Sequence, residues 1–216
     1  MKTIIDRIIE LVEISEASIK LNPLEDQVRK FILRFFATKG KGPSFEEIAK
    51  DLNLTSLEKI RKTIRNLHRA DALTKKGDLI ISAYPFSSIE TPHKIIFEDG
   101  HEVYALCATD ALGIHFMLEK DIKIISKCPA CGKELEINVK DSKINSCEPS
   151  SIIEFVSLSN TGCCAAENLC PFINFFCSKE HLKEWSGRNP EHSNGEIYSL
   201  DEALKHGKII FAERLK

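Results

Sequence analysis

No cysteine precedes Cys107, no apolar run is long, and neither sign of charge prevails in this sequence of 216 residues. No apolar stretch approaches the roughly 18–20 residues that a membrane span needs, so we expect no membrane association. Lys and Arg number 30 against 32 Asp and Glu, for a net charge of −2. This balance excludes a broadly basic nucleic-acid coat protein and a disordered acidic tail. Charges interrupt the apolar residues of Met1–Arg7, which is not typical of a signal peptide. The predicted location is therefore the cytoplasm.

Common cofactor motifs are also missing. Neither a Walker A motif nor a Rossmann glycine pattern occurs, so we expect no organic cofactor. The 7 histidines form no H-E-x-x-H or other metal-binding pattern, and His115 lies in the apolar stretch Ile114–Leu118. We expect His115 to pack there rather than to bind a metal.

The cysteines are concentrated in the second half of the chain. There are 8 of them, namely Cys107, Cys128, Cys131, Cys147, Cys163, Cys164, Cys170 and Cys177. Nothing in the sequence sends the chain to an oxidising compartment, where disulfides would persist. Clustered thiols in a reducing compartment are more often metal ligands or nucleophiles. We therefore expect the function in this half.

The first half is typical of a small helical domain. Apolar spacing and capping sequences predict helices over 1–20, over Asp26–Lys39, after Ser44-Phe45-Glu46-Glu47 and after Thr55-Ser56-Leu57-Glu58. The buried stripe of the last helix is predicted to be Leu57, Ile60, Ile64 and Leu67. Leu73–Ala83 alternates around Lys76-Gly77-Asp78, as a hairpin does. We predict a winged-helix-like N-terminal domain over residues 1–84.

The second half is rich in predicted strands. Residues 85–92 read as a turn-rich connector, and residues 93–216 as a mixed α/β domain with a central β-sheet. Strands are predicted at His93–Glu98, Asp121–Ser126, Glu134–Val139, Ile152–Leu158 and Phe172–Phe176, and helices at about Ala105–Leu118, Lys179–Trp185 and Leu200–His206. The predicted fold class is α+β.

Two cysteine segments can carry chemistry. Cys107 and Asp110 are three residues apart at the start of a predicted helix, so they share a helix face and can meet. The positive end of the helix dipole favours a thiolate, and the carboxylate offers a place for its proton. Cys170 precedes Pro171 and an apolar strand. Taken alone, each cysteine is more typical of packing than of catalysis.

The segment Tyr104-Ala105-Leu106-Cys107-Ala108-Thr109-Asp110-Ala111-Leu112 resembles the active-site segment of alkylmercury lyases, the organomercurial lyases of bacterial mercury resistance. The resemblance extends over roughly residues 93–212, through Ile125-Ser126-Lys127-Cys128, Cys147-Glu148-Pro149, Cys170 with Phe175-Phe176, Trp185 and Ser199–Ala203. This family also carries a winged-helix-like N-terminal domain.

The resemblance implies a lyase that cleaves the carbon–mercury bond to give a hydrocarbon and Hg(II). By the match, Cys107 and Cys170 are the thiols that bind mercury, a soft metal that prefers sulfur. Asp110 is then the general acid/base that takes a thiol proton and returns it to the leaving carbon. Phe116 and Phe172 are candidates for an apolar wall around the organic group. External thiols are expected to release the product, and a mercuric reductase is a candidate partner for metal transfer.

Further cysteines depart from the family pattern. Cys128 matches a structural thiol of the family, whereas Cys131, Cys163 and Cys164 have no evident counterpart. Cys128-Pro129-Ala130-Cys131 and the pair Cys163-Cys164 could close a tetrahedral Zn(II) site. A redox or metal-relay thiol set and unligated cysteines are the alternatives. We interpret Cys147 and Cys177 as packing residues. The extra thiols also leave open another organometallic substrate, such as an organoarsenic or organotin compound.

A function of another class remains open, a metal-sensing transcription regulator or a thiol-rich metal-binding protein. The predicted helix over Thr55–Arg69 carries the basic residues Lys59, Arg61, Lys62, Arg65, His68 and Arg69. A cationic face of this kind can bind DNA phosphates. The net charge of the chain is negative, however, and the resembling family uses this domain structurally. We therefore expect a small organometallic substrate and no nucleic-acid partner.

Overall fold

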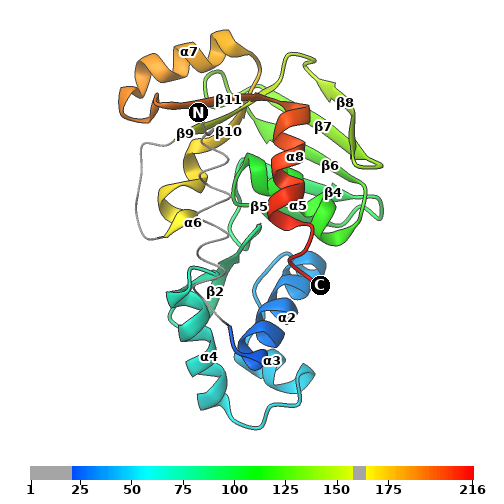
Figure 1. Cartoon of the computed structure of the whole chain (residues 1–216), viewed down its shortest axis with the longest axis vertical. Coiled ribbons are helices and arrows are strands. Elements are labelled where there is room, and N and C mark those ends of the chain that lie inside the picture. The colour runs from blue at the N-terminus through cyan, green and yellow to red at the C-terminus, as the bar shows by residue number, and fades with distance from the viewer. Residues whose placement is uncertain (1–20, 158–163) are drawn as a thin grey trace.

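The computed structural model describes residues 21–157 and 164–216, so the predicted helix over 1–20 lies outside the described residues. From residue 21 on, the N-terminal part contains three helices and a hairpin (Figure 1). These are α2 (Pro23–Lys39), α3 (Phe45–Asp51), α4 (Leu57–Arg69), β1 (Leu73–Lys76) and β2 (Leu79–Ala83). The predicted helices and hairpin are confirmed here, and the winged-helix description of this unit stays a prediction.

Side-chain caps start the helices at the expected places, with one shift. Ser44 and Glu47 form the predicted capping box of α3. At α4 the predicted capping sequence begins at Thr55, but the observed cap is the next residue, Ser56. Its hydroxyl accepts a hydrogen bond from the Lys59 amide at 3.2 Å. This shift places Leu57 in the first turn, where its side chain is 37% exposed rather than part of the buried stripe.

A large antiparallel sheet forms the centre of the molecule. Its order is β1-β2-β3-β5-β4-β6-β7-β8. The new strands are β3 (Phe86–Ser87), β4 (His93–Phe97), β5 (Glu102–Ala105), β6 (Ile122–Lys127), β7 (Glu134–Lys140) and β8 (Lys143–Glu148). Strand β3 lies within the predicted connector 85–92 and pairs with both β2 and β5. The N-terminal hairpin and the central strands are therefore one continuous sheet.

A second, three-stranded antiparallel sheet has the order β10-β9-β11. Its strands are β9 (Ile153–Ser157), β10 (Ile173–Phe176) and β11 (Gly195–Ser199), and the remaining helical segments are α5 (Ala108–Leu118), α6 (Ala165–Asn168), η1 (Cys170–Phe172), α7 (Lys179–Arg188), η2 (Pro190–His192) and α8 (Leu200–Phe211). The predicted α+β class is confirmed in this mixed architecture. None of the helices in the described ranges is both long and apolar enough to cross a membrane.

Helix α5 is buried on all sides, from Ala108 through Met117, as expected for a helix that is apolar all round. It packs against strands of both sheets and against α8 (Figure 1). Glycines allow the close approach of the two helices, because a Cβ atom at Gly207 would lie 2.9 Å from the backbone nitrogen of Gly113. The first turn of α5 is thereby fixed between the two sheets.

The N-terminal helices are attached to the rest of the chain. The ring of Phe36 on α2 stacks on Phe86 of β3, with centroids 6.1 Å apart. The guanidinium of Arg29 donates to the carbonyl of Arg214 at 2.9 Å. The C-terminus consequently lies beside α2 (Figure 1).

Candidate active site

Cys107 and Asp110 lie together at the start of α5. Cys107 is the N-cap of the helix, and its sulfur accepts a hydrogen bond from the Asp110 amide at 3.4 Å. This contact is the cap that a hydroxyl provides in other helices, with sulfur in place of oxygen. The thiol and the carboxyl are thus held on one face of the first turn.

Cys170 reaches the same point from the opposite side. It begins the 3-10 turn η1, directly before β10, and its thiol donates to Oδ2 of Asp110 at 3.8 Å. The two sulfurs and one carboxyl oxygen all lie within 4.8 Å of one another. Cys107 is 2% exposed, and Asp110 and Cys170 are each 5% exposed. The structure therefore brings the three predicted site residues into one buried cluster.

Burial raises the pKa of all three groups in this cluster. It raises the pKa of the Cys107 thiol well above its usual range, and the Asp110 charge adds to the effect. A hydrogen bond with Cys107 lowers the pKa of Cys170, but burial and the charge of Asp110 raise it to a value above normal overall. Burial also raises the pKa of Asp110 to about 7, against the lowering effect of its contacts with both thiols. Both cysteines are therefore thiols at neutral pH, beside a carboxyl group that can gain or lose a proton.

Glu154 is a second buried carboxyl group under the same helical turn. It lies on β9, is 0% exposed, and its Oε1 accepts from the Thr109 hydroxyl at 2.7 Å. Its Oε2 has no hydrogen-bond partner among the described residues. Burial raises the pKa of Glu154 to about 7, and the Asp110 charge contributes. Glu154 was not predicted from the sequence, because a single Glu in an apolar strand carries no motif.

Tyr84 and Asp71 bring the N-terminal part of the chain to the segment that carries Cys170. The Tyr84 hydroxyl donates to Asp71 at 3.2 Å and accepts from the Ala166 amide. Burial raises the pKa of Tyr84, and the charges of Cys170 and Asp71 raise it further. Neither residue was predicted, since only the folded chain places them beside α6.

The two predicted wall residues have different positions. Phe172 lies two residues after Cys170 and stacks on His192, with ring centroids 3.7 Å apart. Phe116 is nine positions after Cys107, about 13 Å along the helix axis, and contacts Lys208. Phe172 is therefore the closer of the two, along the chain, to a cysteine of the cluster. His115 packs as predicted, with both ring nitrogens close to backbone atoms of Lys120 and Ser142.

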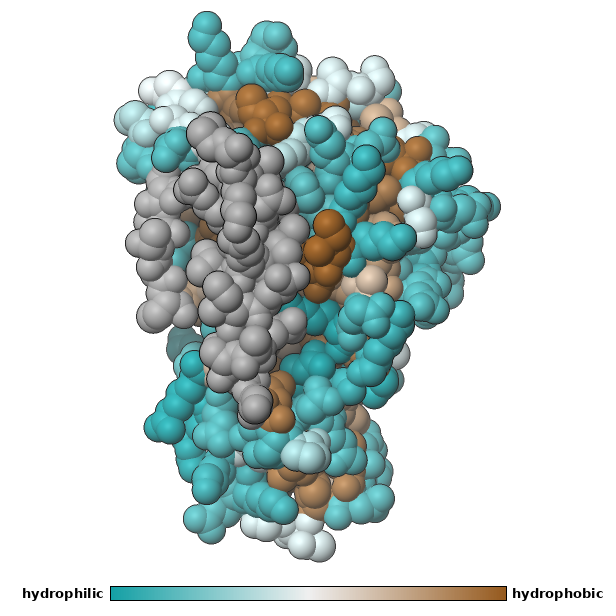
Figure 2. All heavy atoms as spheres, viewed as in Figure 1, coloured by the Kyte–Doolittle hydropathy of each residue, from teal (hydrophilic) through white to brown (hydrophobic). Residues whose placement is uncertain are grey.

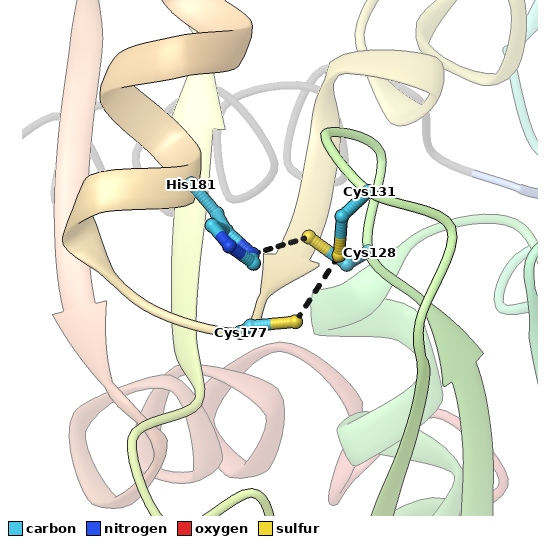
Figure 3. Close-up of side chains that lie close together, drawn as sticks. All are labelled: Cys128, Cys131, Cys177 and His181. Atoms are coloured by element: carbon cyan, nitrogen blue, oxygen red, sulfur yellow. Dashed lines mark hydrogen bonds between the residues drawn. The ribbon is translucent and has the colours of Figure 1, made fainter.

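Three of the remaining cysteines form a second group with a histidine. The ligand atoms of Cys128, Cys131, Cys177 and His181 all lie within 4.8 Å of one another (Figure 3). The ligand set predicted from the sequence was Cys128 and Cys131 with Cys163 and Cys164 instead. Cys164 lies before α6 near Asp71 and Glu167, and Cys163 lies outside the described residues. Cys177 is buried, as predicted for a packing residue, but its sulfur is also 3.6 Å from that of Cys131.

Comparisons with known proteins point to one family. A family model described as alkylmercury lyase matches residues 86–212. The alkylmercury lyase of Staphylococcus epidermidis is 26% identical over 208 residues, which cover 92% of each chain. That of Bacillus cereus is 24% identical over 154 residues, covering 71% of this chain and 67% of the relative. The crystal structure of the mercury-bound form of MerB2 matches with a TM-score of 0.80 at 22% identity, over 97% of this chain and 98% of that one, so the two share a fold. The chain therefore belongs to the alkylmercury lyase family of enzymes.

Proposed function

We propose that this protein cleaves the carbon–mercury bond of an organomercurial by protonolysis and gives a hydrocarbon and Hg(II). The observation that carries the proposal is the convergence of two thiols and one carboxyl group within 4.8 Å, in a buried site. A soft metal prefers sulfur ligands, and a proton donor beside it completes the requirements of the reaction. In this proposal the mercury is the substrate.

In the first step, one thiol replaces the weakly held counter-ligand of the organomercurial, and the thiol proton leaves with that ligand. In the second step, the other thiol gives its proton to Asp110 as its sulfur bonds to mercury. The pKa of Asp110, about 7, suits this role, because the group can accept a proton and release it again near neutral pH. Either Cys107 or Cys170 can take the first step.

In the third step, the two sulfurs donate electron density to mercury and thereby to its carbon. Asp110 protonates this carbon, the carbon–mercury bond breaks, and its electron pair forms the new carbon–hydrogen bond. Hg(II) stays bound to the two sulfurs. Of the two thiol protons, one has left with the counter-ligand and the other is in the hydrocarbon, so the reaction balances without a redox cofactor. Holding all three groups in contact supplies much of the rate.

Product release needs two new ligands for mercury. External thiols exchange with Cys107 and Cys170, which recover their protons as Hg(II) leaves. Free thiols of this kind persist in a reducing compartment, so we place the reaction in the cytoplasm. A mercuric reductase is a suitable partner, because it would consume the released Hg(II).

We infer that the N-terminal unit is a winged-helix-like domain with a structural role. A metal-sensing transcription regulator remains a second candidate function, because the basic residues of α4, from Lys59 to Arg69, are exposed. The lower left of the molecule in Figure 2, where α4 lies in Figure 1, is largely hydrophilic. Arg61, however, is already engaged, since it pairs with Asp78 at 3.1 Å and covers the Phe45 ring. Salt-dependent DNA binding near physiological ionic strength would favour the regulator.

The experiment is an anaerobic assay in excess small thiol, with methylmercury, an organotin and an organoarsenic compound as substrates. We expect methane from methylmercury, measured in the headspace, and Hg(II) in the protein or thiol fraction. Cys107→Ser and Cys170→Ser should each abolish methane release, because a hydroxyl is a hard and weakly acidic ligand. Cys147→Ser, changed on the exposed strand β8, should keep the wild-type rate.

Turnover in either Cys107→Ser or Cys170→Ser would remove the two-thiol assignment. Hydrocarbon release from the tin or arsenic compound alone would show that mercury is not the substrate.

A further inference from the structure

Four potential metal ligands converge at a point that the proposed reaction does not use. Cys128 and Cys131 lie on the loop between β6 and β7, and Cys177 and His181 lie at the junction of β10 and α7. In Figure 3 the four side chains point toward one another from these two segments. We propose that Cys128, Cys131, Cys177 and His181 hold a structural Zn(II) ion.

The distances between the ligand atoms fit one small tetrahedral ion. Bonds of about 2.3 Å to sulfur and 2.0–2.1 Å to nitrogen place two sulfurs about 3.8 Å apart, and sulfur and nitrogen about 3.6 Å apart. The sulfurs of Cys131 and Cys177 are 3.6 Å apart, and Nδ1 of His181 is 3.7 Å from the sulfur of Cys128. All pairs lie within 4.8 Å, so small side-chain shifts complete the tetrahedron. Three cysteines and one histidine are a usual ligand set for structural zinc.

The loop from Cys128 to Lys133 is folded in advance for a metal. The Gly132 amide donates to the Cys128 carbonyl at 2.8 Å, and the Cys128 amide donates to the Lys133 carbonyl at 2.9 Å. Gly132 has a φ of +72°, which a residue without a side chain adopts most easily. Amides of Ala130, Cys131 and Cys177 are directed at the sulfur of Cys128. Such amides stabilise a thiolate, which is the form that binds zinc.

The surroundings also suit a resident ion. Three thiolates, a neutral imidazole and Zn(II) have a net charge of −1. The Arg188 guanidinium donates to the Ala130 carbonyl at 2.9 Å, so a positive charge lies beside the loop that carries Cys131. Cys131 is exposed, whereas Cys128 and Cys177 are buried. A metal can therefore enter past Cys131 and reach ligands that are protected once it is bound. The three cysteines are free thiols, and the 3.6 Å between the sulfurs of Cys131 and Cys177 is too long for a disulfide bond.

The position of the site gives the ion a structural role. It would join the β6–β7 loop of the large sheet to the small sheet and α7. Cys177 follows β10, and Cys170 begins the short 3-10 turn η1 that leads into the same strand. An ion at one end of β10 would thus hold the strand that positions Cys170 at its other end. This inference does not depend on the proposed function, because its test measures bound metal.

The test uses the full chain, purified anaerobically without chelators or mercurials, with zinc measured by elemental mass spectrometry. We expect about one zinc per chain in the wild type, because the site holds one tetrahedral ion. Substitution of a residue that only supports a metal ligand typically lowers metal affinity about 10–100-fold. Cys131→Ser changes a ligand itself, so its zinc affinity, measured against a competing chelator, should fall about tenfold or more. Cys164→Ser should keep its zinc. Cys107→Ser should keep it too, and this result would show that the zinc is not bound by the cluster of Cys107, Asp110 and Cys170.

A second measurement uses Co(II) added to chelator-treated protein that is still folded by circular dichroism. We expect intense visible bands of tetrahedral Co(II) and sulfur-to-cobalt charge-transfer bands in wild type and Cys164→Ser. Cys131→Ser should have weaker charge-transfer bands, and His181→Ala should lose the tetrahedral signature. A folded wild type with neither zinc nor these bands would overturn the proposal. Equal zinc loss in Cys164→Ser and Cys131→Ser would overturn it as well, in favour of the ligand set derived from sequence.

Discussion

Protonation of Asp110 links the buried cluster to pH. Asp110 and Glu154 both have a pKa raised to about 7 by burial, and the two thiols titrate above their usual range. In the proposed reaction Asp110 must be ionised before it can take the second thiol proton. Below its pKa the group is already protonated, so the reactive fraction falls about tenfold for each pH unit.

We therefore predict that the rate of single-turnover cleavage at subsaturating methylmercury, without external thiol, rises with pH from pH 6 and levels off above the Asp110 pKa of about 7. Asp110→Asn should still bind mercury through Cys107 and Cys170, yet release hydrocarbon about 10²–10⁴ times more slowly. Its rate should also lack the rise near pH 7. Rapid-quench measurement of methane against pH, with bound mercury determined in parallel, checks both expectations.

Glu154→Gln is the matched control, because it removes the other carboxyl group with a pKa near 7 and keeps an oxygen for the Thr109 hydroxyl. The rise in rate should persist in this variant. If Glu154→Gln loses the rise while Asp110→Asn keeps it, the proton donor has been assigned to the wrong carboxyl group. The apparent pKa in either case belongs to the coupled cluster rather than to one group.

The site residues differed in how far the sequence could predict them. Cys107 and Asp110 are neighbours on one helical turn, so their spacing alone predicts that they can meet. Cys170 lies 60 residues from Asp110, and only the family resemblance connected it with the other two. Cys177 and His181 belong to a second group whose members come from separate elements. The C-x-x-C half of that group was visible, but its partners depend on how β10 and α7 fold back onto the β6–β7 loop.

At the level of elements, apolar segments predicted the strands that are buried on one face or on both. These include β4, β6, β7 and β10, and each was placed within a residue or two of its observed bounds. Strand β8 was missed because it is an edge strand with no buried residue, so it lacks an alternating apolar pattern. Strand β3 was missed because it has two residues and owes its pairing to its neighbours.

The contact of α5 with α8 supports the turn that carries Cys107 and Asp110. A Cβ atom added at Gly207 would lie 2.9 Å from the nitrogen of Gly113 and 3.2 Å from its Cα. Because backbone cannot move aside, Gly207→Ala should push the two helices apart. We expect the free energy of unfolding to fall by about 1–3 kcal/mol, as measured by urea denaturation.

Gly187→Ala is the control for this prediction. Gly187 also lies in a helix, α7, but an added Cβ atom meets nothing within 4 Å. Alanine is the better helix former, so this variant should be as stable as the wild type or more stable, by up to about 1 kcal/mol. Equal destabilisation in both variants would show that the effect is not close packing of α5 and α8.

At the scale of the whole molecule, the continuous sheet argues that the N-terminal and catalytic parts unfold together. The hairpin β1–β2 pairs through β3 with β5, and β5 leads directly into Cys107. Phe86 on β3 is 0% exposed and stacks on Phe36 of α2. One aromatic pair thus lies between the helical unit and the central strands.

We predict a single calorimetric unfolding transition for the wild type, and also for Phe86→Ala at a lower temperature. Removal of a buried phenylalanine side chain costs about 3–5 kcal/mol, and the loss should affect helical and sheet signals alike. Leu79→Ala, at a β2 position that is 69% exposed, should change stability by no more than about 0.5 kcal/mol. Two transitions, with only the earlier one shifted by Phe86→Ala, would mean that the chain divides at the connector into independent domains. In that case pairing through β3 does not couple the unfolding of the two parts, and the N-terminal unit could be removed without loss of the buried thiol site.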